Sequence, residues 1–278
     1  MNNAGIALVT GATNGIGYEL TRQLLADGWE VAALVRSDFR RDDPLVGASL
    51  ARGQLRTYRA ELTDYQSLRN ALKQVQSEER RLDALFNNAG GSFPKYDFSR
   101  QGRELHFELH GVVPYIILME LKELLRNGTM RTVINTSSSV LKMVKRFDPD
   151  KLERPDTFKK LIGPYATSKL ALSLWTRELA PSLAADGIRM LSVDPGGNNT
   201  TRKGKKSGLP LLVKMMMKLI FPPPTHGASL LYQAATEAHR MPSGSFLLKN
   251  RPYELPFAQY GRQVLERVQA IYEKEYIA

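Results

Sequence analysis

The stretch Thr10-Gly11-Ala12-Thr13-Asn14-Gly15-Ile16-Gly17 follows an apolar run of strand length and opens a segment with helical periodicity. Glycines permit a tight turn here and let backbone N–H groups approach a pyrophosphate closely. The N-terminus of the following helix adds positive potential at the same point. A glycine triplet alone is a weak signal, because turns are rich in glycine. Its place between a strand and a helix predicts a dinucleotide-binding turn.

The rest of the chain continues this alternation of strands and helices. Apolar runs of strand length cover 6–10, 31–35, 55–59, 84–87, 132–136 and 189–193, and helical patterns cover about 15–26, 65–78, 103–126 and 164–185. Nearly continuous apolar strands separated by helices favour a parallel sheet covered on both faces. Right-handed crossovers then give a doubly wound, Rossmann-like α/β fold.

We expect one domain over residues 1–278, because no internal repeat or low-complexity linker divides the chain. Residues 1–130 are expected to form mainly the cofactor-binding half, and 131–278 the catalytic and substrate half. Two stretches interrupt the alternation. Residues 142–163 are polar and charged, which predicts a surface insertion, and 197–224 are basic, then apolar, then proline-rich, which predicts a substrate loop.

The composition excludes several classes of function. The sequence has no cysteine, so disulfides, thiolate metal sites and cysteine nucleophiles are excluded. It shows no secretory signal and no uncharged apolar stretch of transmembrane length, which predicts a cytoplasmic protein. The net charge of +11 fits a solvated basic surface or attraction for an anionic cofactor, a membrane or nucleic acid. No basic helix with interleaved aromatics favours nucleic acid as a partner.

Tyr165 and Lys169 lie four residues apart in the last predicted helix, and so on one face of it. A free tyrosine has a pKa of about 10 and is a poor base at neutral pH. A nearby lysine cation favours the phenolate and is expected to lower that pKa. Tyr165 could then exchange a proton with an alcohol or carbonyl oxygen while a hydride moves to or from nicotinamide. This spacing also occurs by chance, so it needs support from other motifs.

That support comes from the order of the motifs, which resembles the short-chain dehydrogenase/reductase family over roughly residues 4–236. The glycine turn matches the family's T-G-x-x-x-G-[IL]-G, and Asn87-Asn88-Ala89-Gly90 matches its N-N-A-G. The resemblance implies a Rossmann-like fold, an oxidoreductase activity and a nicotinamide cofactor. The closest pattern is that of the retinol dehydrogenase and carbonyl reductase branch.

The resemblance also implies a set of cofactor contacts. The glycine turn would hold the pyrophosphate, and the end of the second strand would select the dinucleotide. That strand ends at Val35-Arg36 without a carboxylate, and Arg36 can pair with a 2′-phosphate, so NADP(H) is favoured over NAD(H). A plain surface arginine remains the alternative. The other implied contacts are Gly11, Thr13, Asn14, Gly15, Ile16, Gly17, Glu61, Leu62, Asn88, Ala89, Gly90, Tyr165, Lys169, Pro195, Gly196 and Thr200.

Two departures from the family pattern are visible. Glu61 stands where the family usually has aspartate, and His110 stands where it has asparagine. In the family that asparagine helps to order a water linked to the lysine, partly through its main-chain carbonyl. His110 could therefore serve the proton relay or simply pack in its helix. His106 and His110 also look like a zinc-binding pair, but the glutamate next to the first histidine and a third ligand are missing, so no metal is predicted.

The substrate-orienting serine of the family falls at the end of the fifth strand. Matching its V-N-V-S-S pattern to this sequence assigns Ser138, with Ser137 and Ser139 as alternatives. A hydroxyl there would hydrogen-bond the substrate oxygen and stabilise developing charge. The long separation of Ser138 from Tyr165 contains the segment 142–163. Pro195, Gly196 and Thr200 match the family's P-G-x-x-x-T element beside the nicotinamide.

These features predict an NADP(H)-dependent oxidoreductase acting on a small-molecule alcohol, aldehyde or ketone, with Ser138, Tyr165, Lys169 and His110 at the reacting centre. The resemblance to the retinol dehydrogenase branch implies that this substrate is lipophilic. The alternative is an NADP(H)-binding regulator or scaffold of the same fold without turnover. Residues 202–221 are read first as a substrate-covering helix, then as a peripheral membrane contact, and last as core. The resemblance also implies a homo-oligomer, a dimer or tetramer formed through the helices at 103–126 and 164–185.

Overall fold

The computed structural model describes residues 5–40, 42–198 and 221–278. Within these residues, eight strands form one sheet in the order β3-β2-β1-β4-β5-β6-β7-β8. Neighbouring strands run parallel except for the final β7–β8 pair. The strands are β1 (Ile6–Thr10), β2 (Glu30–Val35), β3 (Leu55–Arg59), β4 (Ala84–Asn87), β5 (Thr132–Thr136), β6 (Arg189–Asp194), β7 (Phe246–Leu248) and β8 (Arg251–Tyr253). The predicted doubly wound parallel sheet is confirmed.

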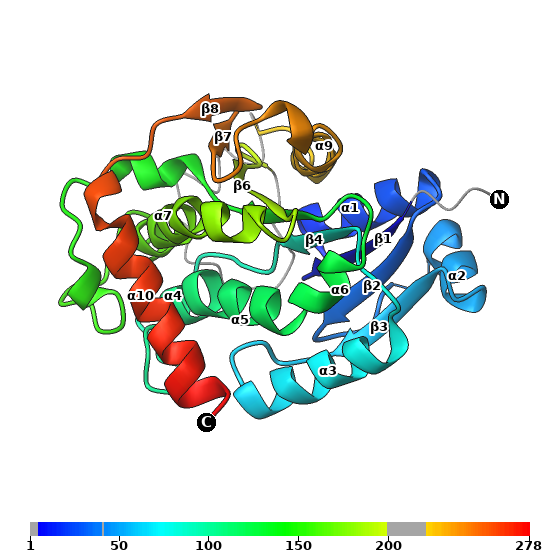
Figure 1. The fold of residues 1–278 in the computed structure, drawn as a ribbon, viewed down its shortest axis with the longest axis horizontal. Helices are drawn as coiled ribbons and strands as arrows, with labels where there is room; N and C mark the ends of the chain where they lie inside the picture. Colours follow the sequence, from blue (N-terminus) through cyan, green and yellow to red (C-terminus); the bar gives the residue numbers. More distant parts are fainter. Residues whose placement is uncertain (1–4, 41, 199–220) are drawn as a thin grey trace.

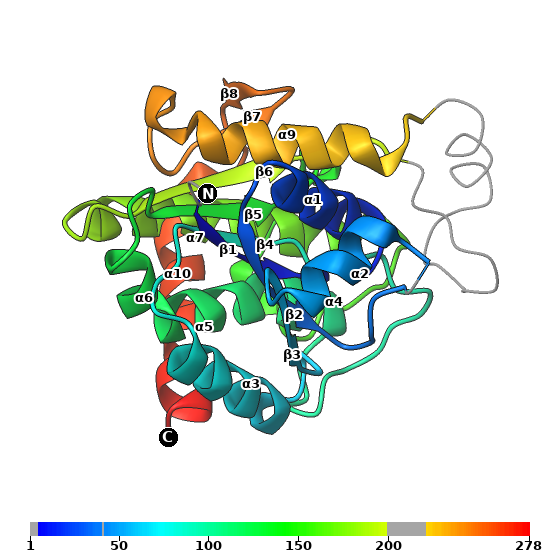
Figure 2. The same cartoon turned by 90° about the vertical axis from the view of Figure 1, so that its right-hand side faces the viewer.

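Helices cover both faces of this sheet (Figures 1 and 2). The apolar core on one face includes side chains of α1 (Gly15–Ala26), α2 (Pro44–Ala51) and α9 (Pro224–Thr236). The core on the other face includes side chains of α3 (Tyr65–Glu78), α5 (Val113–Glu120), α6 (Lys122–Arg126), α7 (Pro164–Ala184) and α10 (Gly261–Ile271). Shorter helical turns are α4 (Leu105–Phe107), η1 (Glu108–Val112), η2 (Ser139–Met143), η3 (Pro149–Lys151), η4 (Ala238–Arg240), η5 (Ala258–Tyr260) and η6 (Tyr272–Tyr276).

The central strands are buried along their whole length, which explains why the sequence predicts them well. Every residue of β1, β4 and β5 is buried, as expected for a parallel sheet with helices on both sides. The carboxyl ends of β1 and β4 meet because these two strands are neighbours. The glycine turn and the N-N-A-G stretch therefore lie at the same edge of the sheet, together with the end of β5.

The helix predicted at 103–126 is broken, which corrects the sequence-based expectation. It consists of α4, the π-helical turn η1, α5 and α6. Pro114 has no N–H and cannot donate to the carbonyl of His110 in the α-helical pattern. In addition, the buried Glu108 carboxylate accepts hydrogen bonds from Arg103 Nε at 2.7 Å and from the Tyr65 hydroxyl at 2.9 Å. These side chains hold the π turn in place.

The segment 142–163 was expected to lie on the surface, and this is only partly correct. Phe147 and Leu152 are 6% and 4% exposed and belong to the core beside α7 and α10. The Phe147 ring lies 5.9 Å from both the Phe257 and the Tyr260 rings. The polar composition of the segment hid these anchors, because they pack against residues more than a hundred positions away.

Candidate active site

The glycine turn packs directly against the N-N-A-G stretch. Gly11 and Gly15 adopt positive φ angles of 68° and 56°, which favour glycine. The backbone N–H groups of Asn88 and Ala89 both donate to the Thr10 hydroxyl at 2.9 Å, and Asn88 Nδ2 donates to the Thr10 carbonyl at 3.1 Å. The two motifs therefore form one rigid corner at the ends of β1 and β4.

The first turn of α1 keeps its N–H groups available for an anion. Within the described residues, no side chain caps this helix at Asn14, and its first turn carries no acidic residue. By contrast, the Asp43 and Asp64 carboxylates accept from the first N–H groups of α2 and α3. Uncapped N–H groups and the helix dipole together suit the pyrophosphate of a dinucleotide. The residues present therefore fit the predicted cofactor.

A substitution at Gly17 tests whether the close packing of the glycine turn against the N-N-A-G stretch is needed for cofactor binding. A Cβ at this position would lie 2.4 Å from the Gly11 carbonyl oxygen and from Asn88 Nδ2. We expect Gly17→Ala to spread the turn, at a cost of about 1–3 kcal/mol, and to weaken NADPH binding measured by fluorescence titration. Gly47→Ala in α2 is the matched control, since a Cβ there meets nothing within 4 Å. Equal NADPH affinity for both variants would contradict the role of this corner.

The side chains at the ends of β2 and β3 form an exposed charged cluster. Arg36 Nη1 lies 3.2 Å from Glu61 Oε2, with the two side chains 70% and 45% exposed. Arg59 Nη1 donates to the Arg36 carbonyl at 3.1 Å, and Thr13 Oγ1 lies 3.5 Å from Ser37 Oγ. Leu62 is buried beside this cluster, at 8% exposure. Arg36 thus lies beside the glycine turn with its guanidinium open to solvent.

Ser138 and Tyr165 come together at the carboxyl end of the sheet. Ser138 follows β5, and its hydroxyl accepts from the Val140 N–H at 3.3 Å. A hydrogen bond with Ser138 lowers the pKa of the Tyr165 phenol. Ser137 instead is buried and lies 2.8 Å from the Ser173 hydroxyl on α7. Of these two serines, Ser138 is the one placed beside Tyr165.

Lys169 lies one turn after Tyr165 on α7 and is 4% exposed. Its Nζ donates to the Thr136 carbonyl at 2.7 Å. A Cβ built on Gly90 would lie 3.5 Å from this Nζ and 3.0 Å from His110 Nε2, so the ammonium lies beside the N-N-A-G stretch. Burial lowers the pKa of Lys169 to about 7.

The prediction that Lys169 lowers the pKa of Tyr165 is wrong for this structure. Burial raises the pKa of Tyr165, the Ser138 hydrogen bond lowers it, and the negative charge of Asp194 raises it again, so that the pKa lies above 10.0. The reason is that Lys169 is itself buried, which favours its neutral form, and its amine is directed to the Thr136 carbonyl. In this arrangement Tyr165 is a proton donor at neutral pH.

His110 lies on η1 and is 1% exposed. Its Nδ1 is 3.0 Å from the Ser168 hydroxyl, and its Nε2 accepts from the Gly91 N–H at 3.3 Å. Burial, followed by the neighbouring Lys169 and His106 side chains, lowers the pKa of His110 well below 6.5, so the ring is neutral. Its ring meets the Tyr165 ring edge-on, with centroids 5.5 Å apart.

A family model for the short chain dehydrogenase matches residues 5–147. The chain belongs to this family. The family comprises NAD(P)-dependent oxidoreductases, and the resemblance inferred from the sequence is confirmed. Two curated relatives are mouse retinol dehydrogenase 12, 28% identical over 69% of this chain and 60% of its own length, and human polyprenol dehydrogenase, 28% identical over 95% and 82%. The chain thus spans less than two thirds of the mouse protein.

Solved structures share the short-chain dehydrogenase fold. A 4-hydroxyisoleucine dehydrogenase complexed with NADH superposes with a TM-score of 0.65 at 20% identity, covering 87% of this chain and 96% of its own. A blue fluorescent protein from a metagenomic library, in complex with NADPH, gives 0.64 at 22% identity, covering 88% and 96%. One of these two structures contains NADH and the other contains NADPH. The likeness in fold therefore leaves the choice between NAD(H) and NADP(H) open.

The structure describes only part of the P-G-x-x-x-T element, which the sequence predicts to lie beside the nicotinamide. Gly196 has a φ of 74°, and Asn198 Nδ2 donates to the carbonyls of Pro195 and Gly196 at 2.8 and 2.9 Å. Thr200 lies outside the described residues, as does 202–221 except for Phe221.

Sequence reasoning missed several residues next to Tyr165. The His106 ring contacts the Tyr165 ring edge-on, with centroids 5.9 Å apart, and also lies against the Phe93 and Phe158 rings. The buried Glu104 carboxylate lies 2.6 Å from His106 Nδ1. The spacing of Glu104 and His106 was visible in the sequence, but only the fold brings Phe93 and Phe158 to them.

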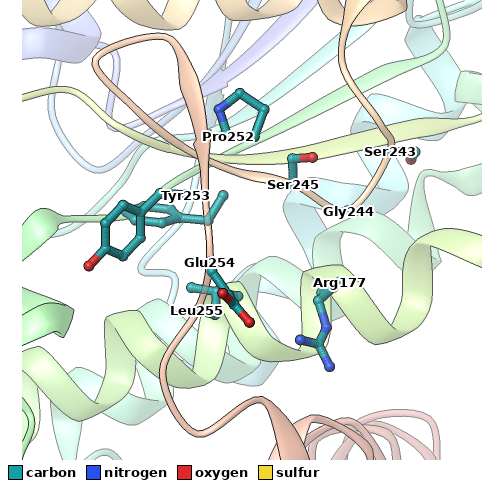
Figure 3. Close-up of a pocket in the computed structure, with 9 residues that line it drawn as sticks. Arg177, Ser243, Gly244, Ser245, Pro252, Tyr253, Glu254 and Leu255 are labelled. Carbon is teal, nitrogen blue, oxygen red and sulfur yellow. The ribbon is translucent and has the colours of Figure 1, made fainter.

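A surface cavity of about 300 Å³ lies away from these residues. Figure 3 shows it between Arg177 on α7 and the segment that carries Pro252, Tyr253, Glu254 and Leu255. Arg177 is three helical turns beyond Tyr165, about 18 Å along α7. The described part of the chain contains no cluster of three or more His, Asp or Glu side chains arranged for a metal ion. Among the same residues, no helix is both long and apolar enough to cross a bilayer.

Proposed function

We propose that this chain is an NADP(H)-dependent oxidoreductase that interconverts a lipophilic alcohol and its aldehyde or ketone. The observation that carries the proposal is the arrangement of Ser138, Tyr165 and Lys169. The Tyr165 phenol is hydrogen-bonded to Ser138, and Lys169 lies one helical turn away on the same face of α7. In the sequence, these three residues come after the glycine turn and the N-N-A-G stretch, which form one corner of the structure.

The residues divide the reaction between them. Bound nicotinamide would supply the hydride for carbonyl reduction or accept it in alcohol oxidation. In reduction, the Tyr165 hydroxyl donates its proton to the substrate oxygen as the carbon gains the hydride, and the raised pKa of Tyr165 keeps that proton in place at neutral pH. Ser138 donates a hydrogen bond to the same oxygen. The phenolate left behind would favour protonation of the Lys169 amine, which would then stabilise it, and the same amine would hold the ribose hydroxyls of a bound nicotinamide cofactor.

NADP(H) is proposed as the cofactor on the strength of Arg36. Its pair with Glu61 is exposed, and exposed ion pairs contribute only about 0–1 kcal/mol. Arg36 can therefore exchange Glu61 for a doubly charged phosphate at little cost.

Arg36→Ala tests this assignment. We expect the preference for NADPH over NADH to shrink about tenfold in fluorescence titrations, because a charge-assisted hydrogen bond is lost. Glu61→Gln frees Arg36 from its partner and should keep or raise the preference. Arg262→Ala, an exposed arginine on α10, is the control. Equal NADPH and NADH affinities in the unmodified chain would overturn the NADP(H) assignment.

A lipophilic substrate is proposed from two observations. The relatives include retinol and polyprenol dehydrogenases, named for apolar alcohols. The Phe93 and Phe158 rings lie against His106, and the His106 ring contacts the Tyr165 ring, so apolar aromatic side chains lie one residue away from Tyr165. The deciding experiment is a screen of long-chain and aromatic aldehydes and ketones with NADPH, followed at the absorbance of the reduced nicotinamide. Turnover excludes the regulator or scaffold alternative, and its absence across the screen favours that alternative.

The expected homo-oligomer and the membrane contact through 202–221 stay predictions. α10 packs along α7, one of the helices expected to join subunits. A second copy using α7 would have to dock on the surface that α10 leaves open.

A further inference from the structure

Two buried histidines lie on successive turns beside Tyr165. His106 belongs to α4 and His110 to η1, and each is 1% exposed. Their ring centroids are 5.8 Å apart, and both rings meet the Tyr165 ring nearly at right angles, at 85° and 88°. The two imidazoles therefore form one wall of the space around the Tyr165 ring.

The two histidines bind the same loop in the same way. After β4, the Gly91 N–H donates to His110 Nε2 at 3.3 Å, and the Phe93 N–H donates to His106 Nε2 at 2.9 Å. A backbone N–H can only donate, so both Nε2 atoms must be unprotonated acceptors. The proton of each neutral ring therefore lies on Nδ1.

Each Nδ1–H has an acceptor that supports this tautomer. His106 Nδ1 lies 2.6 Å from Glu104 Oε1, and Glu104 Oε2 also accepts from the His106 and Phe107 N–H groups at 2.9 and 3.0 Å. Glu104 is completely buried. His110 Nδ1 lies 3.0 Å from the Ser168 hydroxyl, which donates onward to the Tyr165 carbonyl at 2.9 Å. The hydrogen bonds at both ends of each ring are thus mutually consistent.

We propose that Glu104 and His106 form a positioning pair that, together with His110, fixes the loop of Gly91 and Phe93 against Tyr165 through Nε2 acceptors. The pair sets the place of the Phe93 ring, which lies 4.8 Å from the His106 ring. It therefore acts on substrate binding rather than on the proton transfer itself. This inference builds on the proposed function, since it assigns the loop to the substrate side of that site.

Two substitutions at His106 distinguish the contribution of Nε2 from that of Nδ1. Glutamine can place its amide oxygen where Nε2 lies and keep the bond from Phe93, whereas asparagine reaches only the Nδ1 position. We expect His106→Asn to raise KM for an apolar aldehyde about tenfold, because the Phe93 N–H loses its acceptor. Values of kcat and NADPH affinity should stay within about twofold. His106→Gln should keep KM near that of the unmodified chain. An unchanged KM in His106→Asn, or equal losses in both variants, would overturn the proposal.

Nitrogen-15 NMR of the imidazoles in the unmodified chain tests the pair without any variant. The expected spectrum has both His106 and His110 as Nδ1–H tautomers at neutral pH. An Nε2–H or doubly protonated His106 overturns the proposal. In Glu104→Gln, the side-chain amide would face Nδ1 as a donor, so His106 should switch to Nε2–H, and retention of Nδ1–H would remove Glu104 from the pair. If no carbonyl compound is turned over, the proposed function fails, and the NMR result alone decides this inference.

Discussion

Tyr165→Phe is expected to lower kcat about 1,000-fold, which is the middle of the range for loss of a general acid or base. The substitution removes the hydroxyl that would donate its proton to the substrate oxygen. It leaves the aromatic ring of residue 165, which makes edge-to-face contacts with the His106 and His110 rings. NADPH affinity should therefore stay within about twofold. The measurement is single-turnover oxidation of NADPH with the best substrate from the carbonyl screen.

The control for this variant is Tyr253→Phe, since Tyr253 is exposed on β8, the strand at the edge of the sheet. It should leave kcat unchanged. If Tyr165→Phe retained full turnover, another group would have to move the proton, and the proposed mechanism would be refuted. If it lost NADPH binding to the same extent as turnover, the loss would reflect a damaged fold.

Lys169→Met is expected to lower kcat about 100-fold, because it removes the amine that would take up a proton beside the developing phenolate and hold the ribose hydroxyls. It should also change how stability depends on pH. The pKa of Lys169 falls from 10.5 to about 7 on folding, through burial. Between these values the unfolded chain keeps a proton that the folded chain has released. Stability therefore rises with pH in this window, and the contribution from pH 7 to 9 is about 2 kcal/mol.

Chemical denaturation at several pH values measures this contribution as the difference between the unmodified chain and Lys169→Met. The variant should lack the rise between pH 7 and 9. Lys73→Met, on the exposed face of α3, should keep it. A rise of the same size in Lys169→Met would show that the amine is not responsible and that its pKa is close to that of a free lysine.

The strands β1, β2, β4, β5 and β6 were predictable because they are buried on both sides, whereas β7 and the exposed β8 were not predicted. β1, β3, β4 and β5 have the bounds predicted from their apolar runs, and β2 and β6 differ by one residue. The corner at Gly11, Gly17 and Asn88 was also visible, since strand, turn and helix follow one another directly in the sequence. In both cases, the residue types that the local backbone conformation favours are also the ones that fit the tertiary surroundings.

The parts that escaped prediction depend on contacts between distant residues. The π turn at Glu108 depends on Arg103 and Tyr65, and Arg103 also reaches Glu275 of the C-terminal η6 at 2.6 Å. α10 could have been found from Val264, Val268 and Ile271, which share one helical face. The direction in which the Tyr165 pKa shifts could not have been predicted from the sequence. It depends on the burial of Tyr165 and Lys169 and on the hydrogen bond of the Lys169 amine to the Thr136 carbonyl.

The uncapped first turn of α1 has a thermodynamic consequence. A capping side chain typically stabilises a helix by about 1 kcal/mol, and α2 and α3 each have one while α1 does not. An anion bound at this turn would satisfy the same N–H groups and would thereby complete the helix. Ligand occupancy and folding are then linked, so that the heat resistance of the protein would follow the dinucleotide concentration around it. The turn that would bind the dinucleotide would thus also contribute to the stability of the folded chain.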